Sequence, residues 1–403
     1  MIVDLFAGPR GWSEGLRMLG LSDIGLEWDW SACKTAVAAG HATIQTDVAQ
    51  YPTAPFKGRV KGKISSPPCQ PWSRAGKRTG IEDQAHVQQA VHDLAHGRDT
   101  RAELKAACKD ERSLLAAEPM RWLYDLRPEW VCMEQVPDVL PLWRQYAEHL
   151  RAWGYSVWTG GLNAADYGVP QTRKRAILIA SRVRRVTAPA PTHSRHDHGD
   201  TLFGESLEPW VSMAEALGWT TGLTVNTRGA RTTPGGNEFP ADQPSWALTE
   251  KTRSWVLHTN RDQRPDGSRQ TSDPYTAPAP SFTAKAGGQW VLRTGNNTMK
   301  HSRTGSRRGE GGVVAYEREI GEPAPTLDTN VGNKWRLHNG EEKRPITVAE
   351  ATAIQTFPAD YPWQGTKTKQ FEQIGNAVPP LLAAHVVSVA TGIPLIAGLE
   401  VAV

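Results

Sequence analysis

The stretch Asp4-Leu-Phe-Ala-Gly-Pro-Arg-Gly-Trp-Ser-Glu-Gly15 joins the end of an apolar strand to a glycine-containing turn and the start of a helix. Such a unit lets a ligand approach the backbone at Gly8 and presents free amide groups at a helix N-terminus, which suits a carboxylate or a phosphate. Glycine also occurs in this turn for structural reasons alone. From these residues, ligand binding and a plain structural turn are both open interpretations.

Short apolar runs alternate with helical patterns from this stretch to residue 181. Strands alternating with helices predict an α/β fold whose parallel sheet is covered on both faces. The predicted strands are Ile2–Phe6, Ile24–Leu26, Ala42–Val48, Lys63–Ser66, Trp130–Met133 and Ala176–Ala180, and the predicted helices are Trp12–Leu19 and Arg112–Leu126.

The chain is long enough for two domains, because 403 residues exceed what a single core supports. Residues 182 to about 340 are rich in Gly, Pro, Thr, Asn and Arg, which predicts a smaller, mostly β domain. Helical patterns return at Thr347–Phe357 and Pro379–Thr391, and we expect them to pack on the first stretch. The predicted domains are therefore 1–181 plus 341–403, and 182–340.

The composition is that of a soluble globular protein, with 39% hydrophobic and 22% charged residues and a mean hydropathy of -0.49. No run approaches the roughly 18 uncharged apolar residues of a membrane span, and the first apolar strand leaves no room for a signal peptide. We expect a cytoplasmic protein. The four cysteines show no Cys-x-x-Cys pairing, which argues against a disulfide framework or a zinc ribbon.

Basic residues exceed acidic ones only in the middle of the chain. Residues 182–336 hold 20 Lys and Arg against 16 Asp and Glu, whereas the rest of the chain holds 26 of each. A segment free of acids contains Arg293, Lys300, Arg303, Arg307 and Arg308. A solvated loop and a phosphate-contacting surface are both compatible with this cluster.

A weak repeat in the same stretch places one tryptophan on each of three predicted strands, at Trp255, Trp290 and Trp335. The spacings are too uneven for a regular solenoid or propeller. We expect these tryptophans to anchor a core, with base stacking as the alternative.

A second ligand signal follows the first turn, where Gly25-Leu-Glu-Trp-Asp29 ends an apolar strand in an acid. Glu27 lies 19 residues after Gly8, a distance that suits hydrogen bonds to ribose hydroxyls, and Trp28 is placed to stack on an adenine ring. A dinucleotide and a nucleoside such as S-adenosylmethionine both fit this pattern. A solvent-facing acid after a strand remains the alternative.

The strongest chemical signal is Ser65-Ser-Pro-Pro-Cys-Gln-Pro-Trp-Ser73, which places Cys69 between prolines at the carboxyl end of a parallel strand. Sites of open α/β sheets are built at this edge, and a thiolate there is a nucleophile. Glu134 follows another strand, and Arg173 and Arg175 precede a third on alternate positions. A thiol, a carboxyl group and guanidinium groups together suit attack on a polarised heterocycle.

In these motifs and their order, the chain resembles the DNA cytosine-5 methyltransferases, which transfer a methyl group from S-adenosyl-L-methionine to cytosine carbon 5. The resemblance covers residues 1–181 and 344–385, and it implies a Rossmann-like methyltransferase sheet with residues 182–340 as a target-recognition domain. The matching motifs are Asp4-Leu-Phe-Ala-Gly8, Pro67-Pro-Cys-Gln-Pro-Trp-Ser73, Asp110-Glu-Arg-Ser-Leu-Leu115 leading to Glu134-Gln-Val136, Gln171-Thr-Arg-Lys-Arg175, Ala351-Thr-Ala-Ile-Gln-Thr-Phe-Pro358 and Gln373-Ile-Gly-Asn-Ala-Val-Pro-Pro380.

The resemblance assigns catalytic roles residue by residue. Cys69 is then the nucleophile at carbon 6 of the flipped cytosine, and Glu134 holds ring nitrogen 3 and the exocyclic amine. Arg175, with Arg173, binds the carbonyl oxygen of the base. The loop Ser73–Gly80 closes over the DNA backbone.

The resemblance also implies a site for S-adenosyl-L-methionine. Phe6 and Gly8 lie at the first turn, Glu27 at the ribose, and Trp28 on the adenine. Asp47 accepts from the adenine amine, and Asn376 lies near the methionine part. The implied partners are double-stranded DNA and, in a restriction-modification setting, a cognate restriction endonuclease; we expect a monomer from a bacterium or phage.

Three features depart from the family pattern. Arg10 stands where the turn usually has a second glycine, and we expect its side chain to point outward or to pair with a carboxylate. Gln135 replaces the usual Asn after the catalytic Glu, a change that bears on the position of the Cys69 loop. Residues 84–109 form a predicted helical insertion.

Two other functions and one metal site remain to be weighed. A non-catalytic DNA-binding relative would explain Arg10, although Cys69 and Glu134 argue against it. An RNA cytosine methyltransferase of the same fold is the second alternative, and the large basic middle stretch favours duplex DNA instead. The His193-x-x-His196-x-His198 pattern lies in a proline-rich stretch without a nearby cysteine, so we assign no metal to it.

Overall fold

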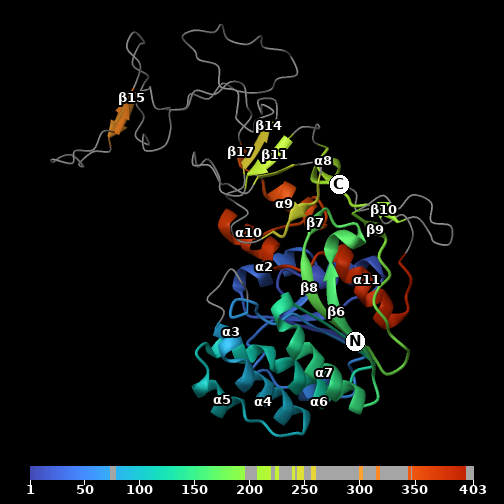
Figure 1. The fold of residues 1–403 in the computed structure, drawn as a ribbon. Helices are drawn as coiled ribbons and strands as arrows, with labels where there is room; N and C mark the ends of the chain where they lie inside the picture. The colour runs from blue at the N-terminus through green and yellow to red at the C-terminus, as the bar shows by residue number, and fades with distance from the viewer. Residues whose placement is uncertain are drawn as a thin grey trace. The chain divides into compact units, whose positions relative to one another are not determined.

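The computed structural model describes 11 segments of the chain, and these segments form two compact units (Figure 1). Unit 1 contains Met1–Thr221, Phe239–Trp255 and Ile346–Val403, and unit 2 contains Gly222–Glu238 and Val256–Pro345. The described segments are 1–72, 79–195, 207–218, 223–226, 238–240, 243–248, 256–259, 299–302, 315–317, 344–345 and 347–395.

A seven-stranded sheet forms the centre of unit 1, in the order β3-β2-β1-β4-β5-β8-β6. Its strands are β1 (Ile2–Leu5), β2 (Ile24–Glu27), β3 (Ala42–Gln45), β4 (Gly62–Ser65), β5 (Trp130–Gln135), β6 (Ser156–Asn163) and β8 (Lys174–Ser181). The strands from β1 to β5 pair in parallel, which confirms the predicted α/β class.

The prediction of a wholly parallel sheet is wrong, because β8 runs antiparallel to both β5 and β6. Only the short segment 164–173 connects β6 to β8, and it contains no crossover helix. A parallel connection needs a dozen or more residues, whereas an antiparallel one does not. The first residues of β8 therefore lie at the edge where the parallel strands end.

Helices cover both faces of this sheet, as the alternating pattern predicted (Figure 1). On β5, Val131 and Met133 pack in the core with α4, α6 and α7, whereas Cys132 packs in the core with α1 and α11. The helices are α1 (Gly11–Met18), α2 (Trp30–Ala38), α3 (Thr79–Glu82), α4 (Gln84–Ala95), α5 (Arg101–Ala107), α6 (Glu118–Leu126), α7 (Leu140–Ala152), α8 (Met213–Ala216), α9 (Val348–Ile354), α10 (Lys367–Asn376) and α11 (Pro380–Thr391).

The segment predicted as one helix at Arg112–Leu126 is divided into a 3-10 helix, η2 (Glu111–Ala116), and α6. Pro119 lies in the first turn of α6, where its missing N–H is tolerated, but it cannot continue a hydrogen-bonded helix from before. The helices predicted within residues 84–109 are confirmed, because α4 and α5 lie there.

Two glycines on α1 allow the C-terminal helix α11 to pack against the N-terminal strand–turn–helix unit. A Cβ atom on Gly11 would lie 2.1 Å from the carbonyl oxygen of Val378, and one on Gly15 would lie 2.7 Å from that of Pro380. Neither separation is possible for a real side chain. The end of the chain thus returns to the first stretch, as predicted.

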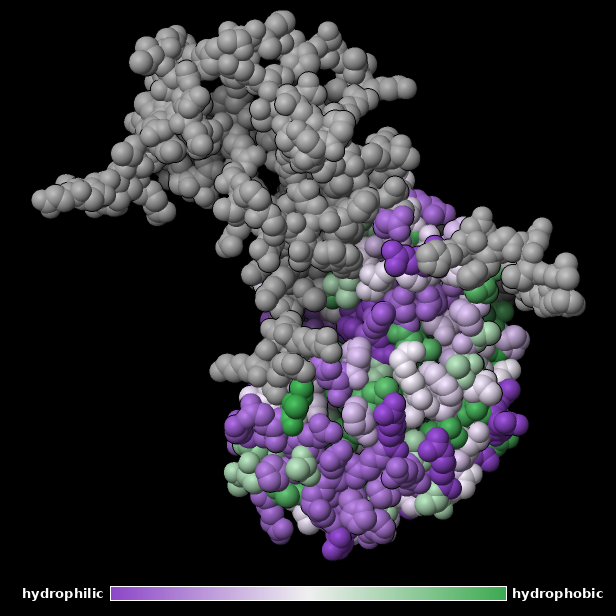
Figure 2. All heavy atoms as spheres, in the orientation of Figure 1, coloured by the Kyte–Doolittle hydropathy of each residue, from purple (hydrophilic) through white to green (hydrophobic). Residues whose placement is uncertain are grey.

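One segment of the described residues, Lys367–Thr391, is long and apolar enough to cross a membrane by length and composition alone. In this fold 67% of its most apolar window is buried inside the protein. It comprises α10 and α11, whose apolar side chains belong to the core of unit 1. Figure 2 shows mainly hydrophilic residues on the face of unit 1 in view, with small hydrophobic areas between them.

The described residues of unit 2 are strands. β14 (Val256–Thr259) pairs antiparallel with β11 (Leu223–Asn226) and β17 (Arg344–Pro345), and β15 (Met299–Ser302) pairs with β16 (Ala315–Glu317). Lys300 lies in β15. The three tryptophans of the predicted repeat, and Arg293, Arg303, Arg307 and Arg308, lie outside the described residues.

The remaining elements are short. They are β7 (Gln171–Thr172), β9 (His193–Ser194), β10 (Glu208–Pro209), β12 (Glu238–Pro240), β13 (Ser245–Trp246), and the 3-10 helices η1 (Ala54–Phe56), η3 (Pro137–Val139) and η4 (Ala164–Tyr167). β13 pairs with β7, and this places Leu248 beside the start of β8.

Candidate active site

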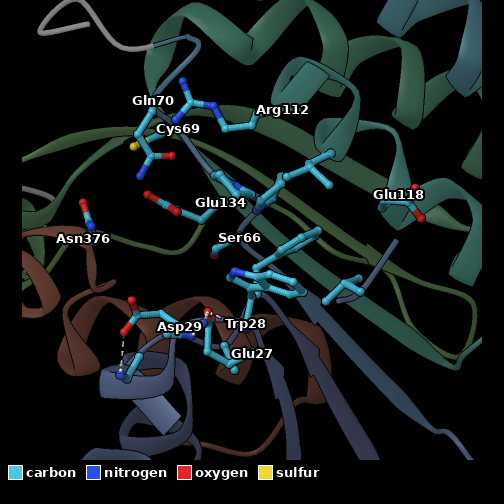
Figure 3. A pocket seen from close by; sticks show the side chains of 18 of the residues that line it. Glu27, Trp28, Asp29, Ser66, Cys69, Gln70, Arg112, Glu118, Glu134 and Asn376 are labelled. Carbon is cyan, nitrogen blue, oxygen red and sulfur yellow. Dashed lines mark hydrogen bonds between the residues drawn. The ribbon is translucent and has the colours of Figure 1, made fainter. Parts of the chain in front are cut away.

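A cavity of about 950 Å³ lies where the parallel strands of unit 1 end, around the point between β1 and β4 where the strand order changes direction (Figure 3). Ligand sites of open α/β sheets occur at this position. All ten residues singled out from the sequence line this cavity: Phe6, Gly8, Glu27, Trp28, Asp47, Cys69, Glu134, Arg173, Arg175 and Asn376. Their individual roles remain predictions.

The first turn is held in an unusual backbone conformation. Phe6 and Gly8 both have positive φ angles, of 61° and 54°. The amide of Gly8 donates to Glu27 Oε2 at 2.8 Å, and the amides of Trp28 and Asp29 donate to Oε1, each at 2.7 Å. Burial raises the pKa of Glu27, and these amide donors oppose that rise. The Glu27 carboxyl group thus fixes the turn after β1 to the end of β2.

The expectation that the Arg10 side chain points outward is wrong, because it lies in the protein interior, away from the cavity. The other expected arrangement, pairing with a carboxylate, is the one found. Its side chain is fully buried, and Nη2 pairs with Asp23 Oδ1 at 2.9 Å. The guanidinium lies over Gly25, where a Cβ atom would be 1.3 Å from Nη1. Burial, and then the nearby Asp23 charge, raise the pKa of Asp4 well above its usual range.

The Cys69 loop is pinned from two sides. Gln135 Nε2 donates to the carbonyl of Pro67 at 2.8 Å, and Trp12 Nε1 donates to Ser66 Oγ at 2.8 Å. The side-chain amide of Gln135 therefore holds this loop, at the position where the resemblance led us to expect asparagine. Figure 3 shows Cys69 and Glu134 toward one end of the cavity, and Glu27 and Trp28 toward the other.

The antiparallel β8 brings Arg175 to the edge where the parallel strands end, and there its Nε donates to Glu134 Oε1 at 2.8 Å. Burial and the Glu134 charge raise the pKa of the Cys69 thiol, whereas Arg175 and Arg173 lower it. The charged neighbours of Cys69 thus act on its pKa in opposite directions.

Arg173 differs from Arg175 in its contacts. It is buried, and its Nη1 donates to the carbonyls of Leu248 at 3.2 Å and Gly375 at 3.0 Å. Burial, and then Arg175, lower the pKa of Arg173 to about 9. This arginine links the start of β8 to the residue before Asn376, and its buried Nε has no hydrogen-bond partner among the residues that the structure describes.

Asp47 lies in the loop after β3, because the strand ends at Gln45 rather than at Val48 as predicted. Its carboxylate accepts from the amide of Ala49 at 2.9 Å and from Gln50 Nε2 at 3.3 Å. These bonds leave Asp47 in a turn that faces the cavity.

The sequence did not predict the helical wall of the cavity. It comes from the end of the 84–109 insertion and from the residues after it, among them Arg101, Lys105, Arg112 and Glu118. The Glu118-x-x-Arg121 spacing at the start of α6 was the available signal, since residues three apart on a helix are neighbours.

Two predicted features lie partly outside the described residues. Of the loop Ser73–Gly80, the structure describes only Thr79 and Gly80, which begin α3. Of the three histidines, it describes only His193, in β9. Among the described segments, no group of three His, Cys, Asp or Glu residues is arranged to hold a metal ion.

Comparison with known proteins relates this geometry to one family. Residues 1–91 and 101–390 match the family described as C-5 cytosine-specific DNA methylase. The type II methyltransferase M.DdeI of Desulfomicrobium norvegicum is 28% identical, over 95% of this chain and 86% of its own length. M1.HphI of Haemophilus parahaemolyticus, also a type II methyltransferase, is 25% identical, over 94% of this chain and 84% of its own length.

Solved structures with the same fold include two methyltransferases. The Entamoeba histolytica methyltransferase EhMeth has a TM-score of 0.51 at 12% identity and covers 96% of this chain and 97% of its own. The S. pombe Dnmt2 methyltransferase has a TM-score of 0.50 at 13% identity, with the same coverage. At these identities the likeness concerns the fold alone.

Proposed function

The chain belongs to the C-5 cytosine-specific DNA methylase family, and from this premise we propose that it methylates carbon 5 of cytosine in a specific duplex DNA sequence. The methyl donor is S-adenosyl-L-methionine. The observation that carries the proposal is the gathering of Cys69 and the Glu134–Arg175 ion pair in the same cavity as the predicted cofactor residues.

The cavity residues fit this cofactor. Trp28 lines the cavity with 72% of its surface exposed, so a flat apolar face is free to take an adenine ring. We assign Glu27, whose carboxylate accepts from three backbone amides, to the ribose hydroxyls. We assign Asp47, which lines the same cavity, to the adenine amine. When bound, the cofactor supplies an electrophilic methyl group on its sulfonium.

The residues at the other end of the cavity fit the substrate base. The Cys69 thiolate forms a bond to carbon 6, while Glu134 holds a proton at ring nitrogen 3 and so stabilises the electron-rich ring. Arg175 orients Glu134 through their ion pair and donates to the carbonyl oxygen of the base. Carbon 5 then takes the methyl group, and S-adenosylhomocysteine is left as the second product. The proton on carbon 5 passes to water, the double bond between carbons 5 and 6 forms again, and the Cys69 thiolate is released.

Carbon 5 of a stacked cytosine cannot reach Cys69, so the target base must flip out of the duplex. We assign catalysis to residues 1–181 and 341–403, and DNA sequence recognition to residues 182–340, whose cationic residues exceed the acidic ones. The relatives M.DdeI and M1.HphI are type II methyltransferases of bacteria. On this basis we propose a monomeric enzyme of the bacterial cytoplasm, with a cognate restriction endonuclease as partner.

Bisulfite sequencing of DNA from cells that express the protein tests this function. Protection of cytosine at one short sequence is the expected result. Protection that is absent from DNA but found in cellular RNA would support the RNA alternative. Purified protein that binds duplex DNA yet transfers no tritiated methyl group from S-adenosyl-L-methionine would support the non-catalytic alternative.

A further inference from the structure

A buried carboxylate joins two arginines on the helical wall of the cavity. Glu118, the first residue of α6, is 3% exposed, and Figure 3 shows it on the helical side of the site. Its Oε1 accepts from Arg101 Nη1, and its Oε2 accepts from Arg121 Nε at 3.1 Å. Burial raises the pKa of Glu118, and the two guanidinium groups oppose that rise. A buried carboxylate without a charged partner would destabilise the fold, so Glu118 depends on its two arginines.

The same two arginines hold the backbone of one loop. Arg121 donates to the carbonyl of Val48 at 2.7 Å through Nη2 and to that of Tyr51 at 3.1 Å through Nη1. Arg101 Nη1 donates to the carbonyl of Ala49 at 3.0 Å. These bonds span more than 50 residues of sequence and fix three carbonyls of a segment that has no sheet partner. Hydrogen bonds from charged donors are the stronger ones in proteins.

This loop carries Asp47, the residue assigned to the adenine amine in the proposed cofactor site. Asp47, Val48 and Ala49 line the cavity, and so do Arg101 and Glu118. Within the described part of the chain, the Asp47 carboxylate accepts hydrogen bonds only from its own turn, from Ala49 and Gln50. The position of its carboxylate relative to β2 and Trp28 therefore depends on what holds the following residues.

We propose that Glu118, Arg101 and Arg121 form a clamp that positions the Asp47–Tyr51 loop and so sets selectivity for the adenine ring of the cofactor. The inference rests on the proposed function, because it assumes that an adenosyl cofactor binds here. The three are positioning residues, which act through Asp47.

The test compares binding of S-adenosylhomocysteine with that of S-inosylhomocysteine, in which a carbonyl replaces the adenine amine. Calorimetry on the full chain gives both dissociation constants for wild type, Glu118→Gln, Arg101→Ala and Asp47→Ala. Wild type should prefer the adenine compound, and each variant should lose about tenfold of that preference. A general loss of stability would weaken both compounds alike and leave their ratio unchanged.

A matched control is Arg98→Ala, which removes an arginine from the same segment. Arg98 pairs with Asp93 and does not line the cavity, so the control should keep the wild-type ratio. In an Asp47→Ala background, Glu118→Gln should lower the ratio no further, because both changes act through the same carboxylate. The conservative Arg101→Lys should restore part of the preference.

An unchanged ratio in both Glu118→Gln and Arg101→Ala would overturn the clamp while leaving the proposed function intact. If Glu118→Gln does not fold, Arg101→Ala decides alone, because Arg101 keeps a 20% exposed side chain whose removal leaves Glu118 paired with Arg121. Wild-type protein that binds neither compound would instead contradict the proposed function itself, and with it the clamp.

Discussion

Replacing Arg10 with glycine, the residue that the resemblance led us to expect at this turn, should destabilise the protein. The guanidinium of Arg10 is buried against Asp23 at 2.9 Å, and Ser13 Oγ donates to the second oxygen of Asp23 at 3.1 Å. Arg10→Gly leaves the Asp23 carboxylate buried without its cation. It also empties the space over Gly25 that the guanidinium fills.

The expected magnitude comes from two opposing terms. Removing one partner of a buried ion pair costs about 3–5 kcal/mol. Arg10 has a φ of 78°, and glycine at this left-handed angle relieves about 1 kcal/mol of backbone strain. The net loss in the free energy of unfolding is therefore about 2–4 kcal/mol.

The loss should depend on pH with a definite sign. Burial already raises the pKa values of Asp4 and Asp23, and Arg10 opposes both rises. Without Arg10 these folded-state pKa values rise further above the unfolded values. A carboxyl group with a raised folded-state pKa stabilises the fold at low pH and loses this contribution as pH rises. The deficit of Arg10→Gly should thus grow from pH 5 to pH 8.

Urea unfolding of wild type and Arg10→Gly at both pH values measures this deficit. Arg17→Ala is the control, because Arg17 lies on the same helix with a half-exposed side chain, and it should change stability by less than about 1 kcal/mol. A folded Arg10→Gly protein should bind S-adenosylhomocysteine as wild type does, since Arg10 does not line the cavity. A glycine variant as stable as wild type at pH 8 would refute the ion-pair explanation.

Three further changes test separate parts of the structure. Gln135→Ala removes the hydrogen bond to the Pro67 carbonyl and should slow methyl transfer by about tenfold or more, with cofactor affinity unchanged. An unchanged rate would show that the Cys69 loop does not depend on this hydrogen bond. Burial lowers the pKa of Lys63 to about 7, so protonation of the buried amine lowers the free energy of unfolding as pH falls. Urea unfolding at pH 6 should therefore show Lys63→Met to be about 2–4 kcal/mol more stable than wild type. Equal stability would contradict this cost of burying the charge. Burial and the nearby His193 lower the pKa of His385 to about 4. The free energy of unfolding of wild type should therefore fall by up to about 3 kcal/mol between pH 6.5 and pH 4. A His385→Asn variant with the same dependence on pH would show that His385 does not cause this loss.

The sequence predicted most of the strands because each is a short apolar run that ends at a chemical motif. Ten residues of the cavity lining were also predicted. Cys69 and Glu134 followed from the meeting of parallel strand ends at one edge, whereas Phe6, Asp47 and Asn376 followed only from the resemblance to the family. The direction of β8 was missed because antiparallel pairing depends on the length of the link from β6, and that strand was not predicted. The sequence therefore predicted the candidate site residues better than the strands and loops that hold them.

The contacts that position the site could not be predicted from local patterns. The burial of Arg10 depends on Asp23 and on the bare backbone of Gly25, which meet only in the folded chain. The loop after β3 is held by Arg101 and Arg121, whose partners lie far away in sequence. A charged side chain near the start of a helix is predicted to be solvent-exposed unless its tertiary partner is known.

The proposed function requires Cys69 to form a covalent bond to the target cytosine. A duplex with 5-fluorocytosine at the position found by bisulfite sequencing blocks the final loss from carbon 5, so the adduct should persist after denaturation. With S-adenosyl-L-methionine, wild type and the control Cys108→Ser should give a covalent complex that peptide mapping assigns to Cys69, and Cys69→Ser should give none. A complex formed by Cys69→Ser, or one mapped to another residue, would contradict the account.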